Sequence, residues 1–201
     1  MFDVQKYWNK RYIGAESKKG YASGYGSDGN ELKFKIDFVS SFMQENNIRT
    51  LCDYGCGSGN FVLSLPKIYD QYIAFDISEN AINICNKRIK NKENLIFTSN
   101  IEDCNRSCHL GLSIDVLFHQ IDLDDLNKYL SNLFRHKYVI IYTTDYEKEY
   151  NPEKAAHVIR RNFSNIIEKN YTNYSLLKRE LYLGNKDQKV FLVYQKKDND
   201  F

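Results

Sequence analysis

The 201-residue chain has little proline and no long hydrophobic segment. It contains only two prolines, and its longest unbroken apolar runs, such as Tyr138–Tyr142, fall far short of the roughly 20 residues that span a bilayer. We therefore expect no membrane span. The first residues show no basic segment followed by an apolar stretch, so we also expect no signal peptide and a cytoplasmic location.

A marked excess of either charge is also missing. Lys and Arg together number 28 and Asp and Glu 26, which gives a formal net charge of +2. This near-neutral total argues against a protein that binds nucleic acid through bulk positive charge. The length corresponds to about one domain, and the 42% hydrophobic content is ordinary for a soluble globular protein.

The five cysteines give only a weak metal signal. Cys52/Cys56 and Cys104/Cys108 are each separated by three residues, with His109 beside the second pair, which raises the alternative of a zinc site. Cys52, however, falls within a predicted strand, where cysteine ordinarily packs as a small apolar residue. We expect free thiols and no metal.

From residue 31 onward, helical and strand patterns alternate. Predicted strands cover 49–54, 72–76, 95–98, 114–118 and 138–142, and predicted helices cover 31–46, 60–68, 78–90, 124–134 and 152–169. This alternation predicts a parallel sheet with helices on both faces. Two final β runs, 176–183 and 189–195, flank a turn at 184–187 and predict a hairpin, so the last strand should run antiparallel to its neighbour.

Residues 1–30 differ from the rest of the chain. A predicted short helix with Tyr7, Trp8, Arg11 and Tyr12 is followed by a segment rich in glycine, serine and tyrosine at 20–29. Composition alone favours a flexible arm, whereas the aromatic and arginine residues favour an arm that docks as a lid. We predict an N-terminal arm over 1–30, a main domain over 31–196 and a tail over 197–201.

A glycine-rich turn, residues 53–59, follows the first predicted strand. Its glycines allow a tight turn and the close approach of a ligand, and the helix start beyond it offers N–H groups to an anion. A dinucleotide fingerprint would need glycine at position 60, where the chain has Asn60. Asp53 would repel a pyrophosphate but suits an ammonium group, and Asp76, after the second strand, can hold a ribose. S-Adenosylmethionine carries both groups.

These residues resemble those of the class I S-adenosylmethionine-dependent methyltransferases. The resemblance is carried by the turn at 53–59, by Asp76 within 74–78 and by residues 114–119, and it covers about 31–195. It implies a Rossmann-like α/β fold with a seven-stranded, mostly parallel sheet, the last strand antiparallel and helices on both faces. It also implies S-adenosylmethionine as cofactor and S-adenosylhomocysteine as product.

The same resemblance implies a set of cofactor-binding residues. Gly55 and Gly57 would pass under the methionine part, Asp76 would hold the ribose, and Ile77 would lie against the adenine. Asn100 or its competitor Asp103 would contact the adenine amine. The full expected set is Asp53, Gly55, Cys56, Gly57, Asp76, Ile77, Asn100, Ile101 and His119. The competing interpretation of the glycines is a tight turn without a ligand.

Candidate acceptor residues follow the fourth and fifth strands and lie in the arm. His119 is the candidate catalytic base, because histidine ordinarily titrates near neutral pH; the alternative is a histidine that only packs. On the predicted helix 152–169, His157, Arg160 and Arg161 would share a cationic face suited to an anion, unless that face is merely solvated. The expected acceptor-binding set is Tyr7, Trp8, Tyr12, Tyr25, Ser27, Gln120, His157, Arg160 and Arg161, with residues 143–145 nearby.

Five segments carry a narrower resemblance: Trp8 to Tyr12, 23–27, 117–119, 138–142 and 157–163. They are similar to small bacterial methyltransferases that accompany surface-polysaccharide genes. This resemblance implies a small anionic acceptor, namely a phosphoramidate, phosphate or sugar derivative, in capsule biosynthesis. Two alternatives stay open: methyl transfer to nucleic acid or protein, and a protein that binds S-adenosylmethionine without catalysis.

Overall fold

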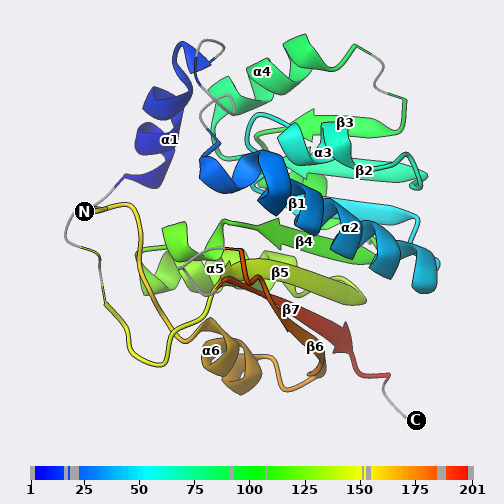
Figure 1. Ribbon diagram of the computed structural model, residues 1–201, viewed down its shortest axis with the longest axis vertical. Helices are drawn as coiled ribbons and strands as arrows, with labels where there is room; N and C mark the ends of the chain where they lie inside the picture. Colours follow the sequence, from blue (N-terminus) through cyan, green and yellow to red (C-terminus); the bar gives the residue numbers. More distant parts are fainter. Residues whose placement is uncertain are drawn as a thin grey trace. The chain divides into compact units, whose positions relative to one another are not determined.

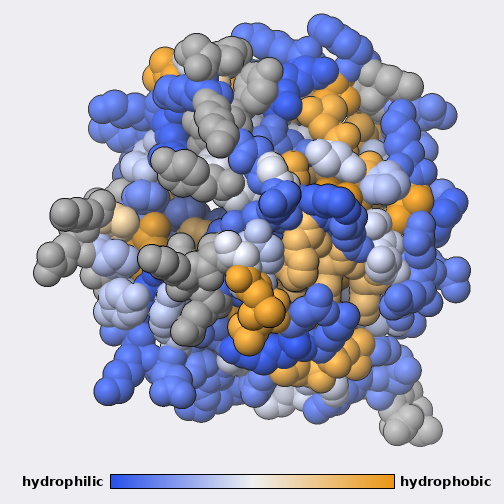
Figure 2. All heavy atoms as spheres, viewed as in Figure 1, coloured by the Kyte–Doolittle hydropathy of each residue, from blue (hydrophilic) through white to orange (hydrophobic). Residues whose placement is uncertain are grey.

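The computed structural model describes residues 3–15, 18, 23–90, 93–106, 108–150, 152, 155–184 and 189–198. The chain divides into two compact units, Met1–His109 and Leu110–Phe201. No helix in the described ranges is long and apolar enough to cross a membrane. Figure 2 shows hydrophilic residues over much of the face in view, with hydrophobic residues in separate patches. The arm, main domain and tail boundaries stay predictions.

The first unit contains parallel strands in the order β3-β2-β1 (Figure 1). The strands are β1 (Thr50–Tyr54), β2 (Gln71–Phe75) and β3 (Leu95–Thr98). The helical elements are α1 (Val4–Tyr12), η3 (Tyr25–Ser27), α2 (Gly29–Glu45), α3 (Asn60–Ser64), α4 (Glu79–Arg88) and η4 (Ile101–Asn105). The predicted strands of this unit are thus confirmed to within a residue at either end.

Local signals explain the ends of two helices in this unit. Ser78 caps α4, because its hydroxyl accepts a hydrogen bond from the Ala81 N–H at 3.3 Å. Helix α3 is shorter than the predicted 60–68. Leu65 is extended, with φ −71° and ψ 131°, as is usual for a residue that precedes proline, here Pro66.

The second unit contains strands in the order β4-β5-β7-β6. The strands are β4 (Leu110–Ile114), β5 (Tyr138–Thr144), β6 (Tyr174–Leu181) and β7 (Lys189–Lys196), and the helical elements are η5 (Leu117–His119), α5 (Leu123–Leu133) and α6 (Phe163–Asn170). Strands β4 and β5 are parallel, whereas β7 is antiparallel to both β5 and β6. The described residues therefore include seven mostly parallel strands with the last one antiparallel, which confirms the predicted fold class.

The strand predicted at 114–118 is wrong. β4 ends at Ile114, and the segment from Leu117 forms the single turn η5. The small residues of β4 hid it from a search for β-branched and aromatic runs. Gly111 is required there, because a Cβ would lie 2.6 Å from Cδ2 of His136.

The helix predicted over 152–169 is wrong in its first half. Helix α6 begins only at Phe163, where Oδ1 of Asn162 caps the helix by accepting a backbone N–H at 2.9 Å. Upstream of the cap, Arg160 and Tyr150 exchange two backbone hydrogen bonds of 2.9 and 3.0 Å in an antiparallel bridge. This bridge extends the backbone where the sequence pattern suggested a helix. The turn predicted at 184–187 lies mostly outside the described residues.

Candidate functional site

The glycine-rich turn joins β1 to α3 in the first unit. The N–H groups of Gly55 and Cys56 both donate to the Phe75 carbonyl oxygen, at 2.8 and 2.9 Å, and tie the turn to the end of β2. Gly57 has a left-handed φ of 56°. A Cβ at this position would lie 2.8 Å from a serine hydroxyl of the arm, so only glycine fits.

Asp76, directly after β2, is buried and holds the turn in place. Its Oδ2 accepts the Gly57 N–H and its Oδ1 accepts the Ser78 N–H, each at 2.9 Å. Burial raises the pKa of Asp76 to about 6, against the opposing effect of these two hydrogen bonds. The carboxylate therefore links the glycine turn to the cap of α4. Its contact with a ribose stays a prediction.

Asp53, at the end of β1, is only 2% exposed. Its Oδ2 accepts the hydroxyl proton of Tyr72 at 2.8 Å. Burial raises the pKa of Asp53 to about 7; the Tyr72 hydrogen bond opposes the rise and the charge of Asp76 adds to it. Two desolvated carboxyl groups beside one turn favour a positively charged ligand, because a nearby cation stabilises their ionised forms.

The residues predicted to contact adenine lie in the same unit. Ile77 is 38% exposed, which is high for a large apolar side chain. Asn100 accepts the Glu102 N–H at 3.2 Å and so caps η4, while Asp103 accepts the Thr98 hydroxyl at 2.5 Å. Ile101 begins η4. Both candidates for the adenine amine already make local hydrogen bonds, and the choice between them stays a prediction.

The N-terminal arm docks on the first unit. Trp8 and Tyr12 of α1 pack against Ala81 and Ile84 of α4. The Arg11 guanidinium lies 5.5 Å from the centre of the Trp8 ring and also donates to the Tyr7 hydroxyl at 3.5 Å. Helix α1 of the arm thus packs against α4, and the role of the arm as a lid stays a prediction. Of the other predicted arm residues, Ser27 donates to the Gly24 carbonyl at 2.6 Å, and the Tyr25 side chain lies outside the described part of the chain.

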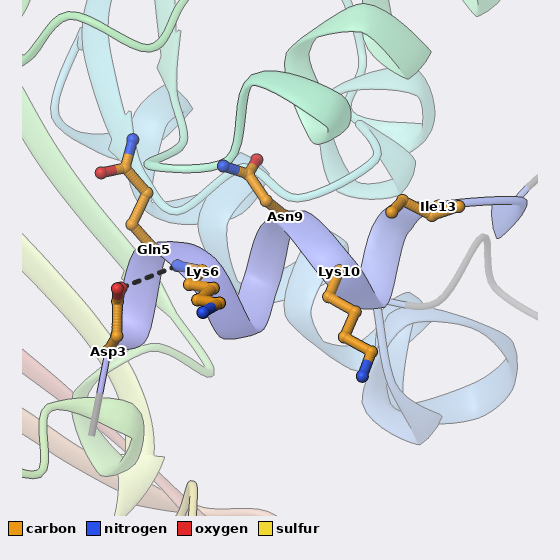
Figure 3. A pocket seen from close by; sticks show the side chains of 6 residues that line it. All are labelled: Asp3, Gln5, Lys6, Asn9, Lys10 and Ile13. Carbon is orange, nitrogen blue, oxygen red and sulfur yellow. Dashed lines mark hydrogen bonds between the residues drawn. The ribbon is translucent and has the colours of Figure 1, made fainter. Parts of the chain in front are cut away.

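A shallow surface hollow also lies along α1. Figure 3 shows its lining, with Asp3 capping the helix through the Lys6 N–H. Every lining residue comes from the one helix and its two flanking residues: Asp3, Gln5, Lys6, Asn9, Lys10 and Ile13. None belongs to the glycine turn, so this hollow is not the predicted cofactor site.

His119 lies in η5 of the second unit, not directly after a strand. Its Nδ1 is 2.7 Å from the carbonyl oxygen of His157, and the two imidazole rings stack at 5.3 Å with 16° between their planes. A carbonyl oxygen only accepts, so Nδ1 must carry the proton. In the neutral ring the lone pair is then on Nε2, the arrangement that a general base requires.

The predicted cationic face does not form, because the segment before Phe163 is not helical. Arg161 is only 4% exposed. Its Nε donates to Glu149 at 2.7 Å, and Nη1 and Nη2 donate to the carbonyl oxygens of Gln120 and Ile121 at 2.9 and 2.7 Å. Arg161 thus fixes the backbone after His119. The Arg160 guanidinium lies instead 5.2 Å from the centre of the Tyr146 ring.

Residues 143–145 are also placed differently from the prediction. Thr143 and Thr144 lie inside β5 and are fully buried. Asp145 accepts the Ser164 N–H and hydroxyl at 3.1 and 2.8 Å and pairs with Arg179 at 2.6 Å. Its carboxylate therefore secures the start of α6, and these contacts give it a structural role.

Sequence reasoning missed an ion pair in the second unit. Asp115, after β4, has a left-handed φ of 59°, and its Oδ1 lies 2.9 Å from the Lys189 ammonium. The ammonium also lies 5.5 Å from the centre of the Tyr142 ring. No local sequence signal indicated this pair, because Asp115 fell inside the strand predicted at 114–118 and Lys189 is far away along the chain. In the first unit, Ser23 and Ser58 were likewise missed.

The described residues contain no group of three or more side chains that could hold a metal ion. All five cysteines are free and buried.

Comparison with known proteins finds a family similarity in the central part of the chain. Residues 51–137 match the family model described as a methyltransferase domain. A release factor glutamine methyltransferase of Mycoplasma mycoides subsp. mycoides is 40% identical over 90 residues. This match covers 44% of the present chain, and the chain spans only 29% of that relative's length.

Solved structures extend the likeness to nearly the whole chain. Magnesium protoporphyrin IX methyltransferase from Synechocystis PCC 6803, with bound S-adenosylmethionine, has a TM-score of 0.69 and 16% identity, covering 98% of this chain and 99% of that one. The N-methyltransferase NodS from Bradyrhizobium japonicum WM9, with S-adenosylhomocysteine, has a TM-score of 0.66 and 12% identity, covering 94% and 99%. Residues 51–137 thus resemble a methyltransferase domain, and the chain has the Rossmann-like fold of these methyltransferase structures.

Proposed function

We propose that this protein transfers a methyl group from S-adenosylmethionine to a small acceptor. The observation that carries the proposal is the pair of buried carboxyl groups, Asp53 and Asp76, beside a turn in which Gly57 is left-handed. Their raised pKa values favour a ligand that brings a positive charge. S-Adenosylmethionine carries both an ammonium and a sulfonium group.

The cofactor-binding residues that we propose in the first unit have distinct roles. Gly55 and Gly57 present backbone to the methionine part, Asp53 balances the ammonium group, and Asp76 accepts from the ribose hydroxyls. Ile77 offers an exposed apolar surface to the adenine. When bound, S-adenosylmethionine supplies a sulfonium methyl group that a nucleophile takes in one displacement. The protein's contribution is mainly alignment of the two reactants.

His119 is the proposed catalytic base in the second unit. With Nδ1–H donated to the His157 carbonyl, Nε2 is the nitrogen that takes a proton from an acceptor hydroxyl or amine. An anionic oxygen is already nucleophilic and needs no such step. Replacing His119 with glutamine should therefore lower transfer to a neutral hydroxyl by roughly 100-fold or more, with little effect on an anionic acceptor.

For the acceptor, we favour a small anion of surface-polysaccharide biosynthesis, such as a phosphoramidate. The narrower sequence resemblance and the near-neutral charge of the chain support this choice. The relatives' names point to diverse acceptors, a porphyrin in one case and a release factor in another. The second candidate, a protein acceptor, rests on the 40% identity to the release factor enzyme.

Titration calorimetry with the full chain tests the cofactor part. S-Adenosylmethionine and S-adenosylhomocysteine should both bind, and Asp76→Ala should abolish binding. Asp70→Ala is the matched control, because Asp70 is exposed and its carboxylate pairs with Arg49 at the surface. No heat with either compound would refute the proposal.

A second assay tests the acceptor class. It compares the transfer of a labelled methyl group to a sugar phosphoramidate, to RNA and to release factor.

A further inference from the structure

Strand β6 is the last in the order β4-β5-β7-β6 of the second unit, so its outer edge pairs with no strand in the described part of the chain. Its middle, residues 176–179, is exposed. The leucines of this strand are open to solvent, because Leu176, Leu177 and Leu181 are 39%, 49% and 51% exposed. An open strand edge with exposed apolar side chains is a surface on which a further strand can pair.

The backbone of β6 presents hydrogen-bonding groups to this edge at alternate residues. The Tyr182 N–H donates to the Lys189 carbonyl oxygen at 2.8 Å, so the backbone of Tyr182 faces β7. In an antiparallel pair, the residues whose N–H and C=O groups face the neighbouring strand alternate along the chain. Counting back from Tyr182 in the observed register, Arg179 and Leu181 direct these groups to the open edge.

A bulge limits the length of this edge. The register of β6 with β7 shifts between Leu176 and Lys178. A bulge bends its strand and disrupts pairing locally, which is one way in which proteins protect sheet edges. The regular part of the open edge therefore runs only from Lys178 to Leu181, and an added strand must be centred within it.

The charges on this short segment are self-complementary. The side chains of Lys178 and Glu180 lie on one face of the strand and form an ion pair of 2.8 Å. When a second copy pairs antiparallel with Arg179 opposite Arg179, Lys178 of each copy lies opposite Glu180 of the other. A register centred on Lys178 or on Glu180 places like charges directly opposite each other, which is unfavourable. Charge complementarity thus selects a single register for a second copy.

Arg179, at the centre of this register, already has a negative partner. Its guanidinium donates to Oδ2 of Asp145 at 2.6 Å, and the Asp145 side chain is only 4% exposed. This pair balances the charge of Arg179 within each copy. The same register also brings the exposed Leu181 of each copy toward the exposed Leu177 of the other, so that apolar surface is covered.

We propose that two copies of this chain pair through the outer edges of their β6 strands, antiparallel and centred on Arg179. The contact is two-fold symmetric, because each copy supplies the same residues to the other. The two Arg179 residues exchange N–H to C=O hydrogen bonds. The Lys178–Glu180 contacts then fall at the adjacent positions, where side chains of an antiparallel pair approach most closely. The inference goes beyond the proposed function and does not depend on the cofactor or the acceptor.

Sedimentation velocity of the full chain over a wide range of concentrations tests the pairing. The unaltered chain should dimerise. Lys178→Glu and Glu180→Lys should each weaken the dimer by roughly tenfold or more, because each change turns attractive cross-strand contacts into repulsive ones. An equal mixture of the two variants should form a mixed dimer, and the double variant Lys178→Glu/Glu180→Lys should dimerise as the unaltered chain does. Glu45→Lys on α2 and Lys128→Glu on α5, at exposed positions, are matched charge reversals that should leave the dimer unchanged.

Each outcome decides the matter. A chain that stays monomeric throughout would refute the pairing and leave the edge of β6 to a strand of another protein. A dimer that the single variants do not weaken, or that mixing them does not restore, would lie on another surface and would refute it as well. Amide hydrogen exchange locates the contact, because the Arg179 and Leu181 amides should become more protected as the concentration rises. Melting temperatures of the variants distinguish lost pairing from unfolding.

Discussion

Replacing Asp53 with asparagine should stabilise the ligand-free protein and weaken cofactor binding at the same time. The Asp53 carboxyl is buried, and its pKa is raised from 3.8 to about 7. The folded protein therefore holds this proton more tightly than the unfolded chain does. The resulting contribution to stability is complete below about pH 4 and is lost as the pH rises through about 7.

The size of this effect follows from the shift. About three pH units at about 1.4 kcal/mol per unit give a ceiling of about 4 kcal/mol lost at pH 8. Asparagine removes the charge while its amide oxygen can still accept the Tyr72 hydroxyl proton. Since about 1 kcal/mol shifts the melting temperature of a chain of this size by roughly 2–4 °C, this ceiling corresponds to a gain of roughly 8–16 °C at pH 8.

Thermal unfolding measured from pH 4 to 8 checks this reasoning. The gain from Asp53→Asn should be small at pH 4 and grow toward pH 8, while Asp70→Asn, at an exposed ion pair, should show no such trend. The variant should also bind S-adenosylhomocysteine more weakly, because the ammonium group loses its counter-charge. A gain that is independent of pH, or a loss of stability at pH 8, would show that desolvation of Asp53 is not the controlling factor.

Three further predictions follow. S-Adenosylhomocysteine should bind about tenfold more weakly at pH 6 than at pH 8, because Asp53, with a pKa of about 7, must ionise for a cation to bind; calorimetry showing a flat profile would contradict this. Gly57→Ala should abolish that binding, because its Cβ would lie 2.8 Å from the Ser23 oxygen and the backbone φ is 56°; unchanged affinity would count against the described turn. Arg161→Ala should destabilise the fold by about 2–4 kcal/mol, because it removes hydrogen bonds to Glu149 and to two carbonyl oxygens. Its melting temperature should fall below that of the unaltered chain, whereas the control Arg106→Ala should leave the melting temperature unchanged. Equal melting temperatures for all three proteins would contradict this role of Arg161.

Sequence patterns predicted much of the fold where an element is determined by interactions among residues close together along the chain. The glycine turn was found because left-handed backbone and a strand–turn–helix order leave a clear signature around Gly57. Strand β5 was found because a strand buried on both faces is continuously apolar. The start of the helix predicted at 78–90 was found because serine is a favoured N-cap residue, and Ser78 does accept the Ala81 N–H in the structure.

The features that the sequence did not predict are determined by residues far away along the chain. Strand β4 contains Gly111, which is needed because a side chain there would collide with the ring of His136. The segment before α6 is extended because Arg160 pairs with Tyr150. The contact between Ser23 and Ser58 has no local signature at all. Side chains that meet only after folding cannot be paired from spacing alone.

The double hydrogen bond to the Phe75 carbonyl has a consequence for how this turn can evolve and be engineered. Both donors, at Gly55 and Cys56, and the acceptor belong to the main chain. No substitution of a side chain deletes these bonds, except proline at a donor position. The geometry that joins the first two strand ends can therefore persist while the side chain at position 56 changes, and an amide-to-ester replacement would remove one bond at a time without the ring constraint of proline.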